Sequence, residues 1–213
     1  MSNFKLIRMT VGMVMTNCYI GYNEDTREAF IVDPGDDARR ISQTVREEKL
    51  NVKGILLTHG HFDHIMAVPE LKAEFGAPVY AHEAEEKLLK DTQMNLSAPW
   101  AGRALSLEAE RLVKDGEKFE LAGFEIQAVH TPGHTAGGVS YYLEAEGVLF
   151  SGDTLFRGSY GRVDLPTASG AEIARSICEK LLPLPEETAV YPGHERETTI
   201  ASERKYNPLS RGF

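Results

Sequence analysis

Five of the chain's seven histidines and two of its aspartates form a pattern that metal binding explains best. Four of these residues fall within positions 59–64, and each of the other three directly follows a glycine. The set consists of His59, His61, Asp63, His64, His134, Asp153 and His194. One metal ion at a catalytic site takes about three protein ligands and a water molecule. Seven candidate ligands are too many for one ion, so the set predicts two ions that share a carboxylate.

The local sequence predicts where the first four of these side chains point. The apolar segment 53–58 leads directly into His59 and is typical of a strand. His59 and His61 lie two positions apart on an extended segment, so both rings point to the same side. Asp63 and His64 open a predicted helix and turn the other way, toward the second ion.

The other three candidates each follow an apolar strand and a glycine. A ligand at the end of a strand is held by the sheet, and the glycine beside it lets the backbone approach closely. His82 and His130 remain outside the set, and His130 is interpreted as an ordinary strand residue.

The elements that must position these side chains alternate between strands and helices. In the first half, strands are predicted at 5–10, 17–22, 28–32, 52–57 and 79–81, and helices at 37–49, 65–75 and 83–90. After an irregular insertion at 91–105, strands are predicted at 110–113, 118–121, 124–130, 138–143, 148–151 and 188–191, and helices at 171–181 and 195–205. This order predicts an α/β protein with two sheets packed together and helices outside.

Length, charge and cysteine content narrow the protein class. A chain of 213 residues is expected to form a single domain, 1–213. A net charge of −9 without a run of Lys or Arg argues against nucleic acid and anionic membranes as partners. Cys18 and Cys178 form no C-x-x-C motif, and the N-terminus carries no obvious export signal. We therefore expect a cytoplasmic protein with two buried thiols and no membrane span.

The motifs around the candidate ligands resemble the metallo-β-lactamase superfamily. Thr-Pro-Gly-His-Thr at 131–135, Gly-Asp-Thr-Leu-Phe at 152–156 and Pro-Gly-His-Glu at 192–195 are most similar to its glyoxalase II (hydroxyacylglutathione hydrolase) branch. The similarity extends over nearly the whole chain, from 17–19 to 207–208. It implies an αββα sandwich of two mixed β-sheets with helices on the outer faces and the active site at one edge of the sheets.

The resemblance also implies a role for each ligand. The implied ligands are His59, His61 and His134 for the first ion, Asp63, His64 and His194 for the second, and Asp153 as the bridge between them. We expect two divalent ions, with zinc first and iron or manganese as alternatives, because a His/Asp set does not choose among these metals.

Full-length glyoxalase II has a C-terminal helical domain whose basic residues help bind glutathione. Only 19 residues follow His194, so we expect that domain to be missing here. The stretch 155–164 is similar to a compact, single-domain glyoxalase II-like subgroup. It also resembles the persulfide dioxygenases, which share its Gly-Arg-x-Asp part.

The expected reaction is hydrolysis of a small-molecule thioester, of the hydroxyacylglutathione type, by hydroxide generated between two ions. Asp63 and Asp153 are the candidate catalytic residues, and Asp63 is expected to steer the attacking water. Asp33, in an Asp-Pro-Gly turn, is a candidate hydrogen-bond partner of a ligand imidazole.

Substrate recognition is predicted in the loop that follows the bridging aspartate. Arg162 and Tyr160 are candidates to hold a carboxylate on the thiol part of the substrate. Arg157 is expected to be a solvated loop charge.

Three other interpretations stay open. A mononuclear iron persulfide dioxygenase would use His59, His134 and Asp153 as a two-histidine, one-carboxylate triad. Another hydrolase, such as a lactonase, fits the same ligands, whereas a β-lactamase is disfavoured by the lack of an evident export signal. A non-catalytic protein with this fold is disfavoured because all seven ligand positions are filled.

Overall fold

The computed structural model of the protein describes residues 3–212, and it consists of two six-stranded sheets packed face to face. The first sheet comes from the N-terminal half, with strand order β1-β2-β3-β4-β5-β6. Its strands are β1 (Phe4–Val11), β2 (Thr16–Asn23), β3 (Glu28–Val32), β4 (Asn51–Leu56), β5 (Val79–His82) and β6 (Arg111–Val113). Strands β1 to β3 are antiparallel, and β3 to β6 run parallel.

The second sheet comes from the C-terminal half, with strand order β14-β13-β10-β9-β8-β7. Its strands are β7 (Lys118–Leu121), β8 (Phe124–His130), β9 (Val139–Leu143), β10 (Val148–Gly152), β13 (Ala189–Pro192) and β14 (Thr198–Thr199). Strands β8 and β10 are both antiparallel to β9, and β13 is parallel to β10. Strands β8, β10 and β13 therefore point the same way and end at one edge of the sheet.

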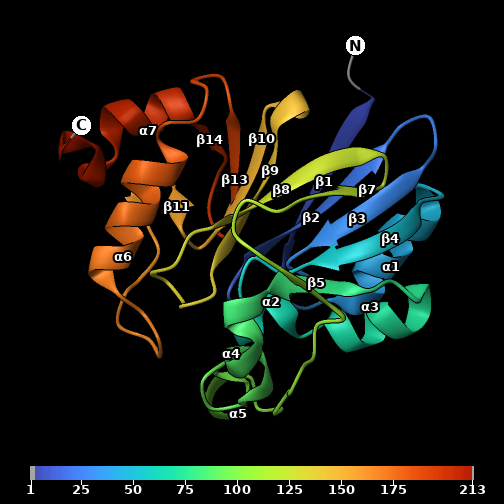
Figure 1. The fold of residues 1–213 in the computed structure, drawn as a ribbon. Coiled ribbons are helices and arrows are strands. Elements are labelled where there is room, and N and C mark those ends of the chain that lie inside the picture. Colours follow the sequence, from blue (N-terminus) through green and yellow to red (C-terminus); the bar gives the residue numbers. More distant parts are fainter. Residues whose placement is uncertain (1–2, 213) are drawn as a thin grey trace.

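Helices cover the outer face of each sheet, which gives four layers in the order αββα (Figure 1). Helices α1 (Ala38–Glu47) and α3 (Val68–Phe75) pack on the first sheet, and α6 (Gly170–Arg175) and α7 (Ile200–Tyr206) pack on the second. The predicted αββα sandwich is confirmed. Within residues 3–212, no helix is both long and apolar enough to span a membrane.

Side-chain alternation along the central strands accounts for this layering. In β3, Phe30 and Val32 face the second sheet, and Ala29 and Ile31 face the helices. All four are buried, because a strand between two packed layers has an apolar environment on both faces.

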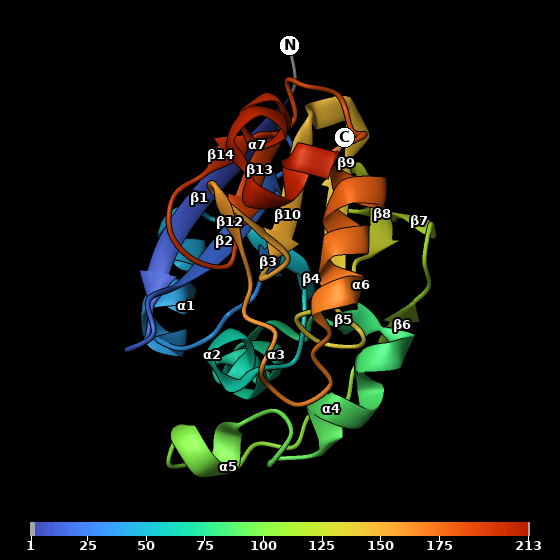
Figure 2. The same cartoon turned by 90° about the vertical axis from the view of Figure 1, so that its left-hand side faces the viewer.

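The ends of several strands meet α2 (Phe62–Ile65), α4 (Glu86–Lys90) and α5 (Ser97–Trp100) at one end of the molecule (Figure 2). The predicted helix 65–75 is divided into α2 and α3, because Pro69 lacks the amide hydrogen needed to continue the first helix. The insertion 91–105, predicted to be irregular, contains the short helix α5. A two-stranded hairpin, β11 (Leu155–Phe156) and β12 (Ser159–Tyr160), follows β10 and was not predicted.

Candidate metal site

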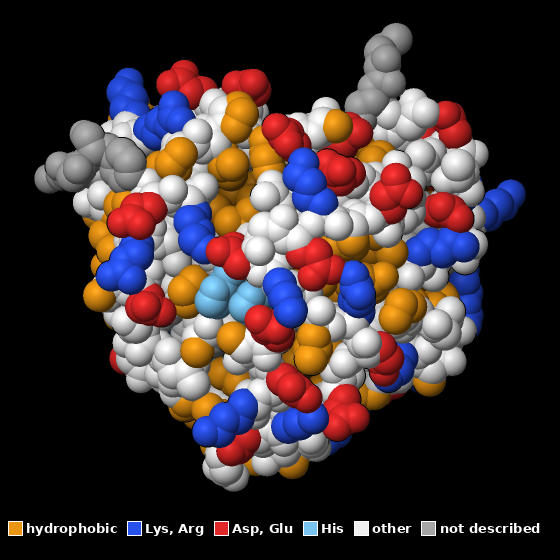
Figure 3. Space-filling model, in the orientation of Figure 1, with side chains coloured by type: hydrophobic (Ala, Val, Ile, Leu, Met, Phe, Trp, Pro, Cys, Tyr) orange, Lys and Arg blue, Asp and Glu red, His pale blue; other side chains and the backbone are white. Residues whose placement is uncertain are grey.

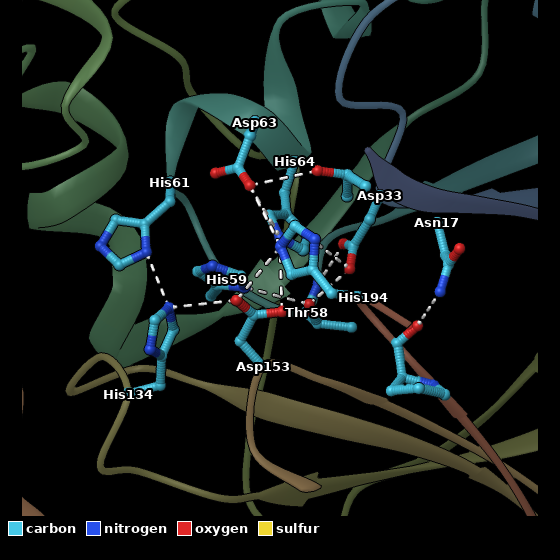
Figure 4. Close-up of polar contacts among 12 residues, drawn as sticks. Asn17, Asp33, Thr58, His59, His61, Asp63, His64, His134, Asp153 and His194 are labelled. Carbon is cyan, nitrogen blue, oxygen red and sulfur yellow. Dashed lines mark hydrogen bonds and ion pairs between the residues drawn. The ribbon is translucent and has the colours of Figure 1, made fainter. Parts of the chain in front are cut away.

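The seven predicted ligands lie together at the edge where both sheets end (Figure 4). The segment after β4 carries four of them, and the loops after β8, β10 and β13 carry one each. These seven residues are His59, His61, Asp63, His64, His134, Asp153 and His194. Each sheet therefore contributes ligands, because the relevant strands of both sheets end at the same edge.

His59, His61 and His134 form the first cluster. Their candidate ligand atoms all lie within 4.8 Å of one another. The Nδ1 atom of His61 lies 2.9 Å from Nε2 of His134. All three side chains are buried, and Nε2 of His59 has no hydrogen-bond partner among the described residues.

Asp63, His64 and His194 form the second cluster, again with candidate ligand atoms within 4.8 Å of one another. The Oδ2 atom of Asp63 lies 3.6 Å from Nε2 of His64 and 3.2 Å from Nε2 of His194. The Oδ2 atom of Asp63 also accepts a hydrogen bond of 3.1 Å from the hydroxyl of Thr16, which orients the carboxylate.

Asp153 lies between the two clusters. Its Oδ2 is 3.5 Å from Nε2 of His134 in the first cluster and 3.5 Å from Nε2 of His194 in the second. Its Oδ1 is 3.5 Å from Nε2 of His64. This is the position of a carboxylate that can coordinate two ions at once. The role of the seven residues as ligands stays a prediction.

Three of the imidazoles are oriented by hydrogen bonds on their other nitrogen. Nδ1 of His64 donates to Oδ2 of Asp33 over 3.0 Å, and Nδ1 of His134 donates to the carbonyl of Arg162 over 2.9 Å. Thr58 donates its hydroxyl hydrogen to Asp33, so its oxygen is left to accept from Nδ1 of His59 at 3.2 Å. In each ring Nε2 is left facing the site, and this is the atom whose lone pair can bind a metal once it carries no proton.

The electrostatics of the two clusters differ. Burial and then the neighbouring imidazole of His134 lower the pKa of His61 to about 3, and burial lowers the pKa of His59 well below its usual value. Burial also acts to lower the pKa of His64, but the nearby carboxylates, that of Asp63 first, outweigh it and raise this pKa to about 10. His59 and His61 of the first cluster are therefore neutral imidazoles. The second cluster holds a protonated imidazole, His64, that must lose its proton to bind a cation.

Glycine next to a ligand is required by close packing, as the sequence predicts. A Cβ atom on Gly193 would lie 2.2 Å from Oδ1 of Asp153 and 2.7 Å from Cε1 of His64. Contacts below 3.0 Å do not occur for real Cβ atoms, so a larger residue at this position would displace the ligands. These packing distances, the buried Nε2 of His59 without a hydrogen-bond partner among the described residues and the neutral imidazoles of His59 and His61 fit divalent cations.

A cleft of about 490 Å³ opens onto the clusters. Its apolar walls include Val14, Phe62, Leu96, Trp100, Phe156 and Leu165. The face of the molecule in Figure 3 carries interspersed Lys, Arg, Asp and Glu side chains, with imidazoles exposed at one place.

The predicted substrate contacts Arg162 and Tyr160 both line this cleft. The guanidinium of Arg162 donates two hydrogen bonds, of 2.6 and 2.7 Å, to Asp164 and lies 6.0 Å from the ring centre of Trp100. Arg162 is therefore at the rim but already has a carboxylate partner. Arg157 is exposed and does not line the cleft, in line with the expected solvated charge.

Two residues that support the candidate ligands, Thr58 and Glu85, were not predicted from the sequence. Glu85 is buried and accepts a hydrogen bond from the amide of Gly60, between two ligands. Its one local signal is that it lies on the same helical face as the buried Leu88 and Leu89, where a charged residue is unexpected. His82 and His130 stack on each other with ring centres 3.9 Å apart and belong to neither cluster.

The chain is similar to known proteins over most of its length. A family model described as "Metallo-beta-lactamase superfamily" matches residues 11–194. "Probable metallo-hydrolase YqgX" of Bacillus subtilis is 38% identical over 207 residues, covering 97% of each chain. "Hydroxyacylglutathione hydrolase GloC" of Haemophilus influenzae is 34% identical over 209 residues, again covering 97% of each chain.

Two solved structures are similar over nearly their full length. BLEG-1, described as a B3 metallo-beta-lactamase, superposes with a TM-score of 0.92 at 41% identity, covering 98% of this chain and 100% of that one. TTHA1623, solved in a di-iron-bound form, gives a TM-score of 0.83 at 36% identity, covering 95% and 99%.

Proposed function

Because this chain belongs to the metallo-β-lactamase superfamily, we propose that it is a binuclear metallohydrolase that cleaves thioesters of the hydroxyacylglutathione type. The broader statement, a metallo-hydrolase of this superfamily, follows from the family match, the relatives and the two ligand clusters. The thioester substrate is the part that we propose.

The observation that carries the proposal is the position of Asp153, with carboxylate oxygens 3.5 Å from imidazoles of both clusters. In our proposal the first ion is held by His59, His61 and His134, the second by Asp63, His64 and His194, and both by Asp153. Zinc is the metal that we expect first. The di-iron form of TTHA1623 supports two ions and keeps iron as an alternative.

Bound divalent cations supply hydroxide near neutral pH and an electrophile for a carbonyl oxygen. The protein's own groups must orient the reactants around them. The carboxylate of Asp63, fixed by Thr16, orients the attacking water. The apolar side chains of Phe62, Trp100 and Phe156 exclude bulk water from the thioester.

The size of the cleft supports a substrate larger than a simple acyl group. A second hollow, of about 340 Å³, adjoins the cleft and shares Val14, Phe62 and Trp100 with it. We place the acyl group over the clusters and the thiol part toward Arg162 and Tyr160. Arg162 can release Asp164 and bind a substrate carboxylate in its place, because an exposed ion pair contributes little to stability.

We also propose that residues 1–213 form one domain that is sufficient for this activity. GloC, which carries the name hydroxyacylglutathione hydrolase, aligns with this chain over 97% of its length. A protein named hydroxyacylglutathione hydrolase therefore has almost no sequence outside the region that aligns with this chain, and little room for an additional glutathione-binding domain.

The experiment that tests the proposal is steady-state hydrolysis of S-lactoylglutathione by the metal-loaded protein. We expect saturable loss of the thioester, abolished by a chelator and restored by zinc. Absence of any thioesterase activity in protein that holds two ions would overturn the substrate class. A single iron per chain, with oxygen consumed on glutathione persulfide, would replace the proposal by the dioxygenase alternative.

A second candidate function is hydrolysis of a cyclic amide or ester, as by a β-lactamase or a lactonase. The similarity to BLEG-1, a described B3 metallo-beta-lactamase, is the observation that favours it. A nitrocefin assay and a lactone assay on the same protein preparation test this alternative. The substrate class with the highest kcat/KM identifies the preferred reaction.

A further inference from the structure

Glu85 is a buried carboxylate that lies behind the first cluster. It is 1% exposed and ends the 3₁₀ turn Glu83–Glu85 that precedes α4. Its Oε1 accepts a hydrogen bond of 2.8 Å from the amide of Gly60. Its Oε2 accepts two more, from the hydroxyl of Thr135 at 3.0 Å and the amide of Gly137 at 2.9 Å.

These three donors lie in the two segments that carry the first cluster. Gly60 stands between His59 and His61, and Thr135 directly follows His134. One oxygen of Glu85 therefore holds the segment after β4, and the other holds the loop between β8 and β9. In the second cluster, by contrast, the ring of His64 is oriented by Asp33.

The surrounding chain is shaped to admit this carboxylate. A Cβ atom on Gly137 would lie 2.2 Å from the amide nitrogen of Glu85 and 2.5 Å from its Oε2. A Cβ atom on Gly60 would lie 2.8 Å from the side chains of Leu88 and Leu89. Both contacts are closer than real Cβ atoms allow. Gly137 therefore approaches the Glu85 turn, and Gly60 approaches the side chains of α4, as closely as glycine permits.

Hydrophobic stabilisation alone gives no reason for a carboxylate at this position. Burying a carboxylate is costly unless it is hydrogen-bonded, and all three of its partners here are neutral. An apolar residue would pack against Leu88 and Leu89 without that cost, but it would leave the three donors without an acceptor. The benefit of Glu85 is that one rigid group ties two loops together.

We propose that Glu85 is a positioning residue of the metal site, which fixes His59 and His61 relative to His134 and thereby governs cation affinity at the first cluster but not at the second. The proposal rests on the two-ion site of the proposed function. It concerns metal binding without substrate, so it can fail or succeed independently of the thioesterase activity.

Glu85→Gln is the decisive variant because it keeps the size of the side chain. An amide has one acceptor oxygen and one NH2 group, so at least one of the three donors must face another donor. The matched control is Glu83→Gln, which removes the same charge from an exposed position in the same turn.

The two clusters are separated by background variants. In His194→Ala the second cluster lacks a ligand, so Zn²⁺ titration of the metal-free protein reports the first cluster. In His134→Ala the first cluster lacks a ligand, so the same titration reports the second cluster. We expect Glu85→Gln to weaken Zn²⁺ binding about 10- to 100-fold in the His194→Ala background, the range typical for groups that orient metal ligands. In the His134→Ala background we expect a change of less than about threefold, and Glu83→Gln should change neither.

Thr135 provides a milder variant in case Glu85→Gln does not fold. Thr135→Val removes the hydroxyl donor to Glu85, and Thr135→Ser keeps it. We expect weaker first-cluster binding in Thr135→Val and recovery in Thr135→Ser, with circular dichroism confirming the fold of both. Unchanged first-cluster affinity in folded Glu85→Gln would overturn the proposal. Equal losses at both clusters would show a general structural role and overturn it as well.

Discussion

Nδ1 of His64 lies 3.0 Å from Oδ2 of Asp33, and the other oxygen of Asp33 accepts a 2.8 Å hydrogen bond from the amide of Thr58. The pair is buried, and it joins the end of β3 to helix α2, which carries Asp63 and His64 of the second cluster. Asp33 adopts a left-handed backbone conformation, with φ of 48°, which is uncommon for a residue other than glycine. The chain thus holds this carboxylate in place for the imidazole.

Loss of the Asp33 carboxylate should act on the second cluster. Asp33→Asn keeps the shape but weakens the hydrogen bond that orients His64. We expect zinc affinity at the second cluster to fall about 10- to 100-fold. The first cluster should lose less affinity, because Asp33 reaches His59 only through Thr58. Metal content after dialysis, measured by elemental analysis, should drop from two ions to one. The control is Asp36→Asn on the exposed part of the same loop. Two tightly held ions in Asp33→Asn would contradict this role.

Loss of Asp153 should affect both ions at once. Asp153→Ala removes the carboxylate that lies 3.5 Å from His64, His134 and His194, so we expect hydrolysis to be abolished and metal content to fall below one ion per chain. His82→Ala removes an imidazole outside both clusters and should change neither quantity per folded molecule. Full activity in Asp153→Ala would show that this residue is not the bridge.

The two clusters should respond differently to pH. The pKa of His64 is raised to about 10 by its carboxylate neighbours, so a cation that binds there must displace a proton. A lower pH favours the protonated imidazole over the metal-bound one. With increasing pH, zinc affinity at the second cluster should therefore rise about tenfold per pH unit between pH 6 and 8. Burial keeps His59 and His61 neutral in this range, so they release no proton and the first cluster should respond less. Calorimetric titration in buffers of different ionisation enthalpy measures the protons released. Equal proton release at both clusters would refute the difference.

Arg162 should affect substrate binding and leave the metals in place. Its backbone carbonyl orients His134, but that contact survives a side-chain substitution. We expect Arg162→Ala to raise KM and lower kcat/KM for S-lactoylglutathione about 10- to 150-fold, the effect of one lost charge-assisted contact of about 1.5–3 kcal/mol. Asp164→Ala frees the guanidinium and should lower KM. An unchanged kcat/KM in Arg162→Ala would remove this residue from the substrate site.

The clustering of the seven candidate ligands could be predicted because its signals are local. The histidines of the 59–64 segment are close in sequence, and a glycine precedes His134, Asp153 and His194. The neighbouring residues alone therefore mark each of them as a candidate ligand. The layer order could also be predicted, since β3 and β4 are apolar on both faces and only a strand between two layers needs that.

The supporting groups could not be predicted because their contacts are distant in sequence. Glu85 is 25 residues from Gly60 and 52 from Gly137, and nothing near any of them indicates the others. Helix boundaries were also wrong where capping decided them. The predicted helix 195–205 begins at Ile200, because Thr199 caps it by accepting a hydrogen bond from the amide of Ser202 and Glu195 has a left-handed φ of 65°.

The division of ligands between the two sheets has a consequence for folding. His61 and His134 are 73 residues apart and belong to different halves of the chain, so an ion bound by both is a cross-link between the sheets. A cross-link restricts the unfolded chain most when the loop that it closes is long. Metal ions bound at the two clusters should then act as reversible cross-links that stabilise the folded chain. Removing the ions would let the two halves of the chain separate more easily. Resistance to heat and to proteases would then depend on whether the chain binds its ions before or after it folds.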